Sequence, residues 1–104
     1  MTEYRVILIT CGEEEEANQI GNILIEERLA ACVNIIPKIT SIYRWKGEVC
    51  RDLEVLLIVK AREGTLGKLE ERVKAIHSND VVEVIALPVS NGSAEYLDWV
   101  KSVC

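Results

Sequence analysis

The sequence predicts an α+β fold in which two helices cross between the strands of one antiparallel sheet, in the order β-α-β-β-α-β, with a further helix at the C-terminus. Three observations favour this fold. Short apolar runs alternate with segments of helical spacing, a long hairpin pattern lies between the two crossover helices, and 104 residues suffice for one hydrophobic core but not for two. We therefore expect one domain over residues 1–104.

The first strand and helix are predicted within residues 6–28. Val6-Ile7-Leu8-Ile9 is an apolar run bounded by polar residues and a glycine, which is typical of a buried central strand. Thr10-Cys11-Gly12-Glu13 fits the capping-box pattern of a helix start, and the glutamates at 13–16 suit the positive end of the helix dipole as a solvated first turn. Apolar residues at helical spacing extend this helix to about Arg28, namely Ala17, Ile20, Gly21 and Leu24.

Residues 31–61 predict a long β-hairpin. The outgoing arm is interrupted by Pro37, Lys46-Gly47 forms the turn, and the run from Leu53 to Val59 returns. Each arm could reach about 40 Å at ~3.3 Å per residue, which is longer than so small a core can cover. We expect the overhanging part to pair with an identical subunit, because an exposed apolar edge strand invites strand addition.

The C-terminal third predicts a helix, a strand and a closing helix. Residues 81–89 form the strand, and Pro88 places it at a sheet edge or at a strand end. Ser93 is a candidate N-cap of the last helix. The apolar positions of the two helices are Leu66, Leu69, Val73 and Ile76, then Tyr96, Leu97, Val100 and Val103. The complete order is the split βαβ, or ferredoxin-like, arrangement.

Composition narrows the classes of partner. Seventeen acidic against twelve basic residues give a net charge of −5, which repels nucleic-acid phosphates and anionic membrane surfaces. The N-terminus lacks a basic segment followed by an apolar stretch, and no apolar run approaches the ~20 residues of a membrane span, so we expect a cytoplasmic protein. The four cysteines contain no C-x-x-C pair, which favours free thiols.

Three residues are candidate metal ligands. Cys11 ends the first strand beside a helix N-terminus, where the dipole is expected to lower the thiol pKa and favour the thiolate. His77, the only histidine, follows the second helix; it either caps that helix's carbonyls or ligates a metal near a thiolate or a carboxylate such as Glu83. Cys32, in an apolar strand, is most simply a small core residue.

Aromatic residues on the hairpin suggest a second site. Tyr43 and Trp45 share one strand face, as in ordinary cross-strand packing, but on an overhanging hairpin they equally suit an interface anchor or the wall of an inter-subunit cleft. Lys60, at the end of the returning strand, is either a surface residue with its stem packed or an anion-binding amine beside a cleft.

The sequence resembles the CutA family of divalent-cation tolerance proteins over nearly the whole chain. The most specific part is Arg28-Leu29-Ala30-Ala31-Cys32-Val33-Asn34, followed by Ile36-Pro37 and by Ser41-Ile42-Tyr43-Arg44-Trp45-Lys46-Gly47. The resemblance implies a homotrimer of ferredoxin-like subunits, a role in tolerance of copper or other divalent ions, metal binding near the family's histidine, and no enzymatic reaction. The family pattern H-P-Y-x-x-P-E here reads His77-Ser78-Asn79-Asp80-Val81-Val82-Glu83, which loses both prolines and the tyrosine.

Two hypotheses of function follow. The first is a trimeric CutA-like protein that binds Cu²⁺ or another divalent cation weakly at inter-subunit clefts, through His77, Cys11 and Glu83, without an organic cofactor. The second is a regulatory module resembling the trimeric PII signalling proteins, with a small anion or a partner protein bound in a cleft formed by Cys32, Tyr43, Trp45 and Lys60. An acylphosphatase-like enzyme is disfavoured, because Glu13 and Glu14 stand where a phosphate loop would need positive charge.

Overall fold

The structure, a computed structural model, describes residues 2–104 and gives four strands and three α-helices over that range. The strands are β1 (Tyr4–Cys11), β2 (Cys32–Trp45), β3 (Glu48–Arg62) and β4 (Val84–Pro88). The helices are α1 (Glu14–Glu26), α2 (Leu66–Ile76) and α3 (Ala94–Val103), and a 3-10 turn, η1 (Glu63–Thr65), precedes α2.

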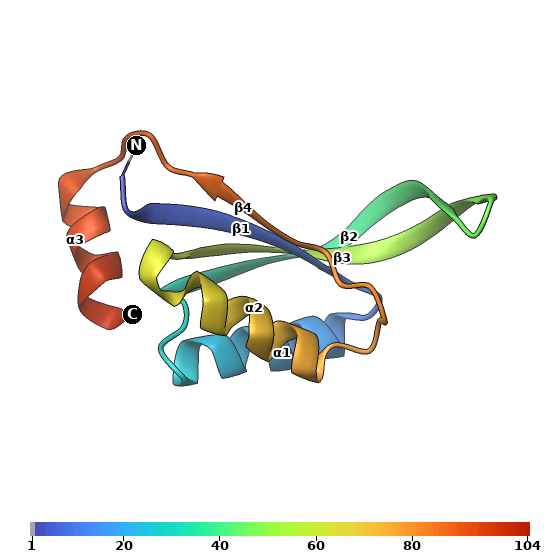
Figure 1. Cartoon of the computed structure of the whole chain (residues 1–104), viewed down its shortest axis with the longest axis horizontal. Coiled ribbons are helices and arrows are strands. Elements are labelled where there is room, and N and C mark those ends of the chain that lie inside the picture. The colour runs from blue at the N-terminus through green and yellow to red at the C-terminus, as the bar shows by residue number, and fades with distance from the viewer. Residues whose placement is uncertain (1) are drawn as a thin grey trace.

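The strands form one antiparallel sheet in the order β2-β3-β1-β4. Helices α1 and α2 lie side by side on one face of the sheet, and α3 lies at the end of the sheet away from the hairpin tip (Figure 1). Two crossover connections through helices on the same face are the defining feature of the split βαβ arrangement. The predicted ferredoxin-like fold is therefore confirmed.

The hydrophobic core lies between the sheet and helices α1 and α2. Alternate residues of the two central strands point into it, and the aliphatic stripe of each helix covers them. The largest fully buried side chains of this core are aliphatic except for Cys11: Ile7, Ile9, Cys11, Ile20, Leu24, Leu57, Val59, Leu69 and Val73. At about 25 cal/mol per Å² of buried apolar surface, this layer is the main source of stability.

Helix α1 begins and ends differently from the prediction. Its N-cap is Glu13, without a side-chain capping hydrogen bond, so the predicted capping box does not form; the acidic first turn still suits the helix dipole. The helix ends at Glu26, because Arg28 adopts a left-handed φ of 57°. The Leu29 N–H then donates to the Leu24 carbonyl and the Arg28 N–H to the Ile25 carbonyl, which is a Schellman motif.

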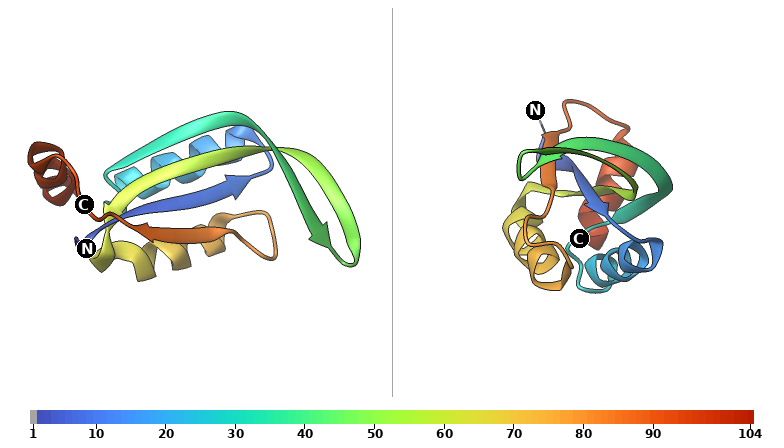
Figure 2. Two further views of the ribbon diagram at one scale, coloured as in Figure 1. Left: turned by 90° about the horizontal axis from the view of Figure 1, so that it is seen from above. Right: turned by 90° about the vertical axis from the view of Figure 1, so that its right-hand side faces the viewer.

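The hairpin extends beyond the sheet, as predicted. Strands β2 and β3 remain paired out to Trp45 and Glu48, whereas β1 covers β3 only from Val55 to Arg62. A shift of register between Ile36 and Ile39 brackets Pro37, and positive φ angles at Lys46 and Gly47 form the tight turn. The arm projects past the helices and bends (Figure 2). Its apolar residues are exposed: Ile42 by 63%, Val49 by 65% and Leu53 by 61%.

Strand β4 is shorter than predicted and occupies a sheet edge. It covers Val84–Pro88 instead of residues 81–89, and within the described chain it pairs only with β1. Pro88 is the last residue of the strand and lies opposite Arg5. Proline has no backbone N–H, but at this end position no hydrogen bond inside the sheet is lost. Residues 78–83 consequently form a loop that leads from α2 to the sheet edge.

Over residues 2–104, the second face of the sheet is covered by a helix only at one end, where α3 lies near Val6 and Lys60. Register places Leu8 opposite both Ile58 and Ile85, and Val6 opposite Leu87, on the side away from α1 and α2. Ile85 and Leu87 are 50% and 45% exposed. An apolar part of this face is thus left open.

Candidate metal centre and the adjoining cleft

Three potential ligand groups meet where β1, α1 and α2 come together. Cys11 is the last residue of β1, Glu16 lies in the first turn of α1, and His77 immediately follows α2. Their ligand atoms, one sulfur, one carboxylate oxygen and one ring nitrogen, all lie within 4.8 Å of one another. Thiolate, imidazole and carboxylate form a donor set that suits Zn²⁺ and other borderline transition metals.

Cys11 is fully buried, and its thiol is not activated. Burial first, and then the negative charges of Glu16 and Glu54, raise the pKa of Cys11 from 9.0 to about 12. The prediction that the dipole of α1 lowers this pKa is wrong, because loss of solvent and two nearby carboxylates outweigh the dipole. The thiol is therefore protonated at neutral pH, and a metal has to displace its proton.

His77 bridges two backbone segments through its ring. The Asn79 N–H donates to Nδ1 at 3.0 Å, and Nε2 lies 2.8 Å from the carbonyl oxygen of Thr10. An N–H can only donate, so Nδ1 is the acceptor and Nε2 carries the proton that it donates to Thr10. The ring therefore donates to a carbonyl of β1. It does not bond to the last carbonyls of α2, which was the alternative role predicted for His77.

Glu16 takes the place that the sequence analysis gave to Glu83. One oxygen of Glu16 accepts a hydrogen bond of 2.9 Å from the Ser78 N–H. Glu83 is exposed, lies outside the cluster, and has its Oε1 3.5 Å from the Thr10 hydroxyl. The sequence analysis missed Glu16 because it lies within the four-glutamate run. Its position in the first turn of a helix that starts just after Cys11 was the signal that could have identified it.

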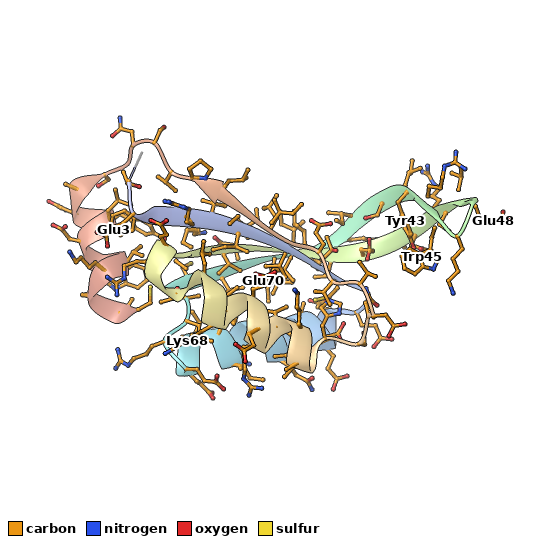
Figure 3. The ribbon with its side chains drawn as sticks, in the orientation of Figure 1. Glu3, Tyr43, Trp45, Glu48, Lys68 and Glu70 are labelled. Carbon is orange, nitrogen blue, oxygen red and sulfur yellow. The ribbon has the colours of Figure 1, made fainter. Side chains whose placement is uncertain are left out.

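A cleft of about 720 Å³ adjoins the candidate metal centre. Tyr43 and Trp45 of β2 form one wall, and the loop residues from Ser78 to Val81 form the other. Both aromatic side chains lie on the projecting part of the hairpin (Figure 3). Glu54, Asp80 and Glu83 give the lining a negative charge.

Polar contacts of the hairpin orient the aromatic wall. The Tyr43 hydroxyl donates a hydrogen bond to the Asp52 carboxylate across the strand pair. That bond, together with burial and nearby charges, raises the pKa of Tyr43 to about 12. The Lys46 ammonium lies 5.9 Å from the centre of the Trp45 ring, which is within the range of a cation–π contact.

Cys32 and Lys60 lie at the other end of the sheet, and neither lines this cleft. They are directly paired across β2 and β3, where the Lys60 ammonium donates to the Asn34 side-chain oxygen. Lys60 lines a second cavity of about 250 Å³ together with Tyr96 and Leu97. Within one chain, the four predicted cleft residues therefore form two separate pairs. Cys32 is only partly buried and is not a core residue as expected.

Over residues 2–104, no helix is both long enough and apolar enough to cross a membrane.

Comparison with known proteins identifies the family. Residues 5–103 match the sequence profile of the CutA1 divalent ion tolerance protein. The divalent-cation tolerance protein CutA of Thermus thermophilus is 56% identical over 96 residues, which are 92% of this chain and 93% of that protein. Protein CutA of Mus musculus is 48% identical over 95 residues, 91% of this chain but 54% of that protein. The chain thus spans about half the length of the mouse relative.

Solved structures agree in fold. The divalent cation tolerance protein (Cut A1) from Thermus thermophilus superimposes with a TM-score of 0.94 at 54% identity, and the alignment covers 96% of this chain and 97% of that chain. The periplasmic divalent cation tolerance protein CutA from Archaeoglobus fulgidus gives a TM-score of 0.94 at 37% identity, with the same coverage of 96% and 97%. This chain therefore belongs to the CutA1 divalent ion tolerance protein family.

Proposed function

We propose that this protein binds a divalent transition-metal cation through Cys11 Sγ, a carboxylate oxygen of Glu16 and a ring nitrogen of His77, and that this binding underlies a role in divalent-cation tolerance. The observation that carries the proposal is the convergence of three donor atoms from three elements within 4.8 Å. Two donors, sulfur and imidazole, favour Zn²⁺ or copper over Mg²⁺ or Ca²⁺, which prefer oxygen ligands.

The state of the three groups supports weak binding at neutral pH. Cys11 must lose a proton held with a pKa of about 12, and Glu16 and His77 each accept a backbone N–H in the present arrangement. Each of these costs reduces the apparent affinity for the cation. A tolerance protein that buffers a cation in excess is compatible with such an affinity.

We further propose that the working form is the homotrimer that membership of this family implies. The open apolar face around Leu8 and Ile85, the exposed hairpin arm, and the free edges of β2 and β4 all support association. Association through these surfaces would also allow the separated pairs, Tyr43 with Trp45 and Cys32 with Lys60, to meet across subunits in the predicted inter-subunit clefts.

Calorimetric titration with Zn²⁺ and Cu²⁺ tests the ligand set. We expect Cys11→Ala and His77→Ala each to weaken binding at least tenfold, and Glu16→Gln to weaken it several-fold. Glu83→Gln is the matched control, because its carboxylate is nearby but outside the cluster. Equal affinity of the wild type and His77→Ala would contradict the proposed site.

A regulatory module that binds a small ligand in the cleft is the second candidate function. Its support is the size of the cleft and the two aromatic side chains in its wall. The carboxylates of Glu54, Asp80 and Glu83 favour a cationic ligand over the small anion expected from the sequence. A change of Trp45 fluorescence on addition of a ligand, without any metal, would favour this function.

Three further expectations remain predictions. The relatives' names describe a tolerance role and no reaction, which agrees with a protein that is not an enzyme. The acidic net charge disfavours nucleic acids and membranes as partners. A cytoplasmic location is the expectation from the N-terminal sequence, although the relative from Archaeoglobus fulgidus is described as periplasmic.

A further inference from the structure

Two ligand groups of the candidate metal centre, Glu16 of α1 and His77 after α2, are held by the loop that follows α2. The Ser78 N–H donates to Glu16 Oε2 at 2.9 Å, and the Asn79 N–H donates to His77 Nδ1 at 3.0 Å. Over the described chain, no backbone-to-backbone hydrogen bond joins residues 78–83 to another segment, and β4 pairing starts only at Val84. These two contacts hold the first half of the loop, and near its end the Thr10 hydroxyl lies 3.5 Å from Glu83 Oε1.

His77 cannot ligate a metal while both of its ring contacts persist. Its Nδ1 lone pair is used by Asn79, and its Nε2 carries the proton donated to Thr10. Ligation through Nδ1 displaces the Asn79 N–H directly. Ligation through Nε2 requires the ring proton to move to Nδ1, and a protonated Nδ1 can no longer accept from Asn79. Either route breaks the Asn79 contact.

The part of the loop freed in this way, from Asn79 onward, lines the cleft. Ser78, Asn79, Asp80 and Val81 line it opposite Tyr43 and Trp45. The metal centre and the cleft therefore share one structural element, whose attachment depends on the state of His77. Two sites that bias the same element are thermodynamically coupled.

We propose that metal ligation by His77 releases the segment from Asn79 to Val81, while the Ser78 N–H stays bonded to Glu16, and so changes the cleft, and that the candidate metal centre and the cleft are coupled through the Asn79 N–H. This inference rests on the proposed metal-binding function. Coupling of this kind is reciprocal. A ligand of the cleft that requires the present loop position lowers the affinity for the metal, and the metal lowers the affinity for that ligand by the same factor.

Zn²⁺ alone is the probe, since it is diamagnetic and takes sulfur, nitrogen and carboxylate ligands. Amide hydrogen exchange measured by NMR reports on Asn79, and tryptophan fluorescence in a Trp99→Phe background reports on Trp45. We expect Zn²⁺ to increase exchange at Asn79 at least tenfold and to shift the Trp45 emission. His77→Ala should abolish both responses.

Substitution of Asn79 by proline tests the hydrogen bond between the Asn79 N–H and His77 Nδ1 by itself. Asn79→Pro removes the competing N–H, so Zn²⁺ should bind about fivefold more tightly, the equivalent of one net hydrogen bond. Asn79→Ala keeps the N–H and should bind as the wild type does. Asp80→Pro is the second control, because it places the same ring one residue later and retains both loop donors.

The outcomes separate the coupling from the proposed function. Zn²⁺ binding that depends on Cys11 and His77 but leaves Asn79 exchange and Trp45 emission unchanged would overturn the coupling and leave the function intact. Equal Zn²⁺ affinity of Asn79→Pro and Asn79→Ala would also overturn the coupling. Zn²⁺ binding that is independent of Cys11 and His77 would overturn both.

Discussion

The buried thiol of Cys11 and the carboxylate of Glu16 lie within 4.8 Å of each other, at the junction of β1 and α1. With burial, this negative charge raises the pKa of Cys11 to about 12, so the thiol is neutral in the metal-free protein. Both the reactivity of the thiol and the dependence of stability on pH follow from this relationship.

Cys11 should resist alkylation in the folded protein. With a pKa of about 12, roughly one thiol in 10⁴ is ionised at pH 8, and the thiolate is the reactive form. Iodoacetamide labelling at pH 8, followed by peptide mass spectrometry, should leave Cys11 unmodified in the native protein and modify it readily in urea. Glu16→Gln should raise the native labelling rate only modestly, because burial is the larger cause. Rapid native labelling would contradict the raised pKa.

Stability should fall in alkaline solution because of the same thiol. Above pH 9 the unfolded chain ionises Cys11, while the folded protein retains the proton up to about pH 12. The folded state then binds more protons, so the free energy of unfolding decreases with pH, by at most about 1.4 kcal/mol per pH unit from this group. Urea unfolding at pH 8 and pH 10.5 should show the stability advantage of the wild type over Cys11→Ala narrowing. A constant difference would contradict this assignment.

The fold could be predicted from the sequence because its signals are local. Apolar runs such as Val6–Ile9 and the three-and-four spacing from Leu66 to Ile76 each specify one element, and the order of the elements then leaves one reasonable topology. The length of β4 could not be predicted in this way. Val81 is apolar, yet it lies in a loop, because β4 pairing with β1 stops at Val84 although β1 continues to Cys11, and the carbonyl of Thr10 there is bonded to the His77 ring instead.

The candidate metal centre could be predicted only in part. Cys11 and His77 have side chains typical of metal ligands, so both were predicted as candidates, and the structure brings them together. Glu16 is one of four consecutive glutamates, and only the angle between β1 and α1 decides which of them reaches the cluster. The position of the ring proton on His77 likewise depends on its contacts with Thr10 and Asn79, of which the first joins residues far apart in the sequence.

The end of α1 offers a test of backbone strain. Arg28 has a φ of 57°, the left-handed conformation at the position after the helix where glycine is usual. Its Cβ disfavours that conformation, so Arg28→Gly should stabilise the protein by up to about 1 kcal/mol in urea unfolding. Arg28→Ala keeps the Cβ and should give no such gain. Equal effects of glycine and alanine would show that the conformation carries no strain.

The aromatic wall of the cleft should respond to Asp52. The Tyr43 hydroxyl donates to this carboxylate, and the hydrogen bond is the main reason that the pKa of Tyr43 is raised to about 12. Asp52→Asn should lower the pKa of Tyr43 towards the ordinary value of about 10. An NMR titration of ¹³C-labelled tyrosine would follow Tyr43 separately from Tyr4 and Tyr96. An unchanged pKa in Asp52→Asn would exclude this hydrogen bond in solution.

Association should depend on the open face of the sheet. Ile85 is half exposed and lies opposite Leu8 on the side of the sheet away from α1 and α2, so a charge there would be buried in any assembly that covers this face. Light scattering with size-exclusion chromatography should give three chain masses for the wild type and one for Ile85→Lys. Ile25→Lys is the matched control, because Ile25 is similarly exposed but lies on α1, in the helical layer. A monomeric wild type would remove the inter-subunit clefts, whereas the candidate metal centre, which is built from one chain, would remain.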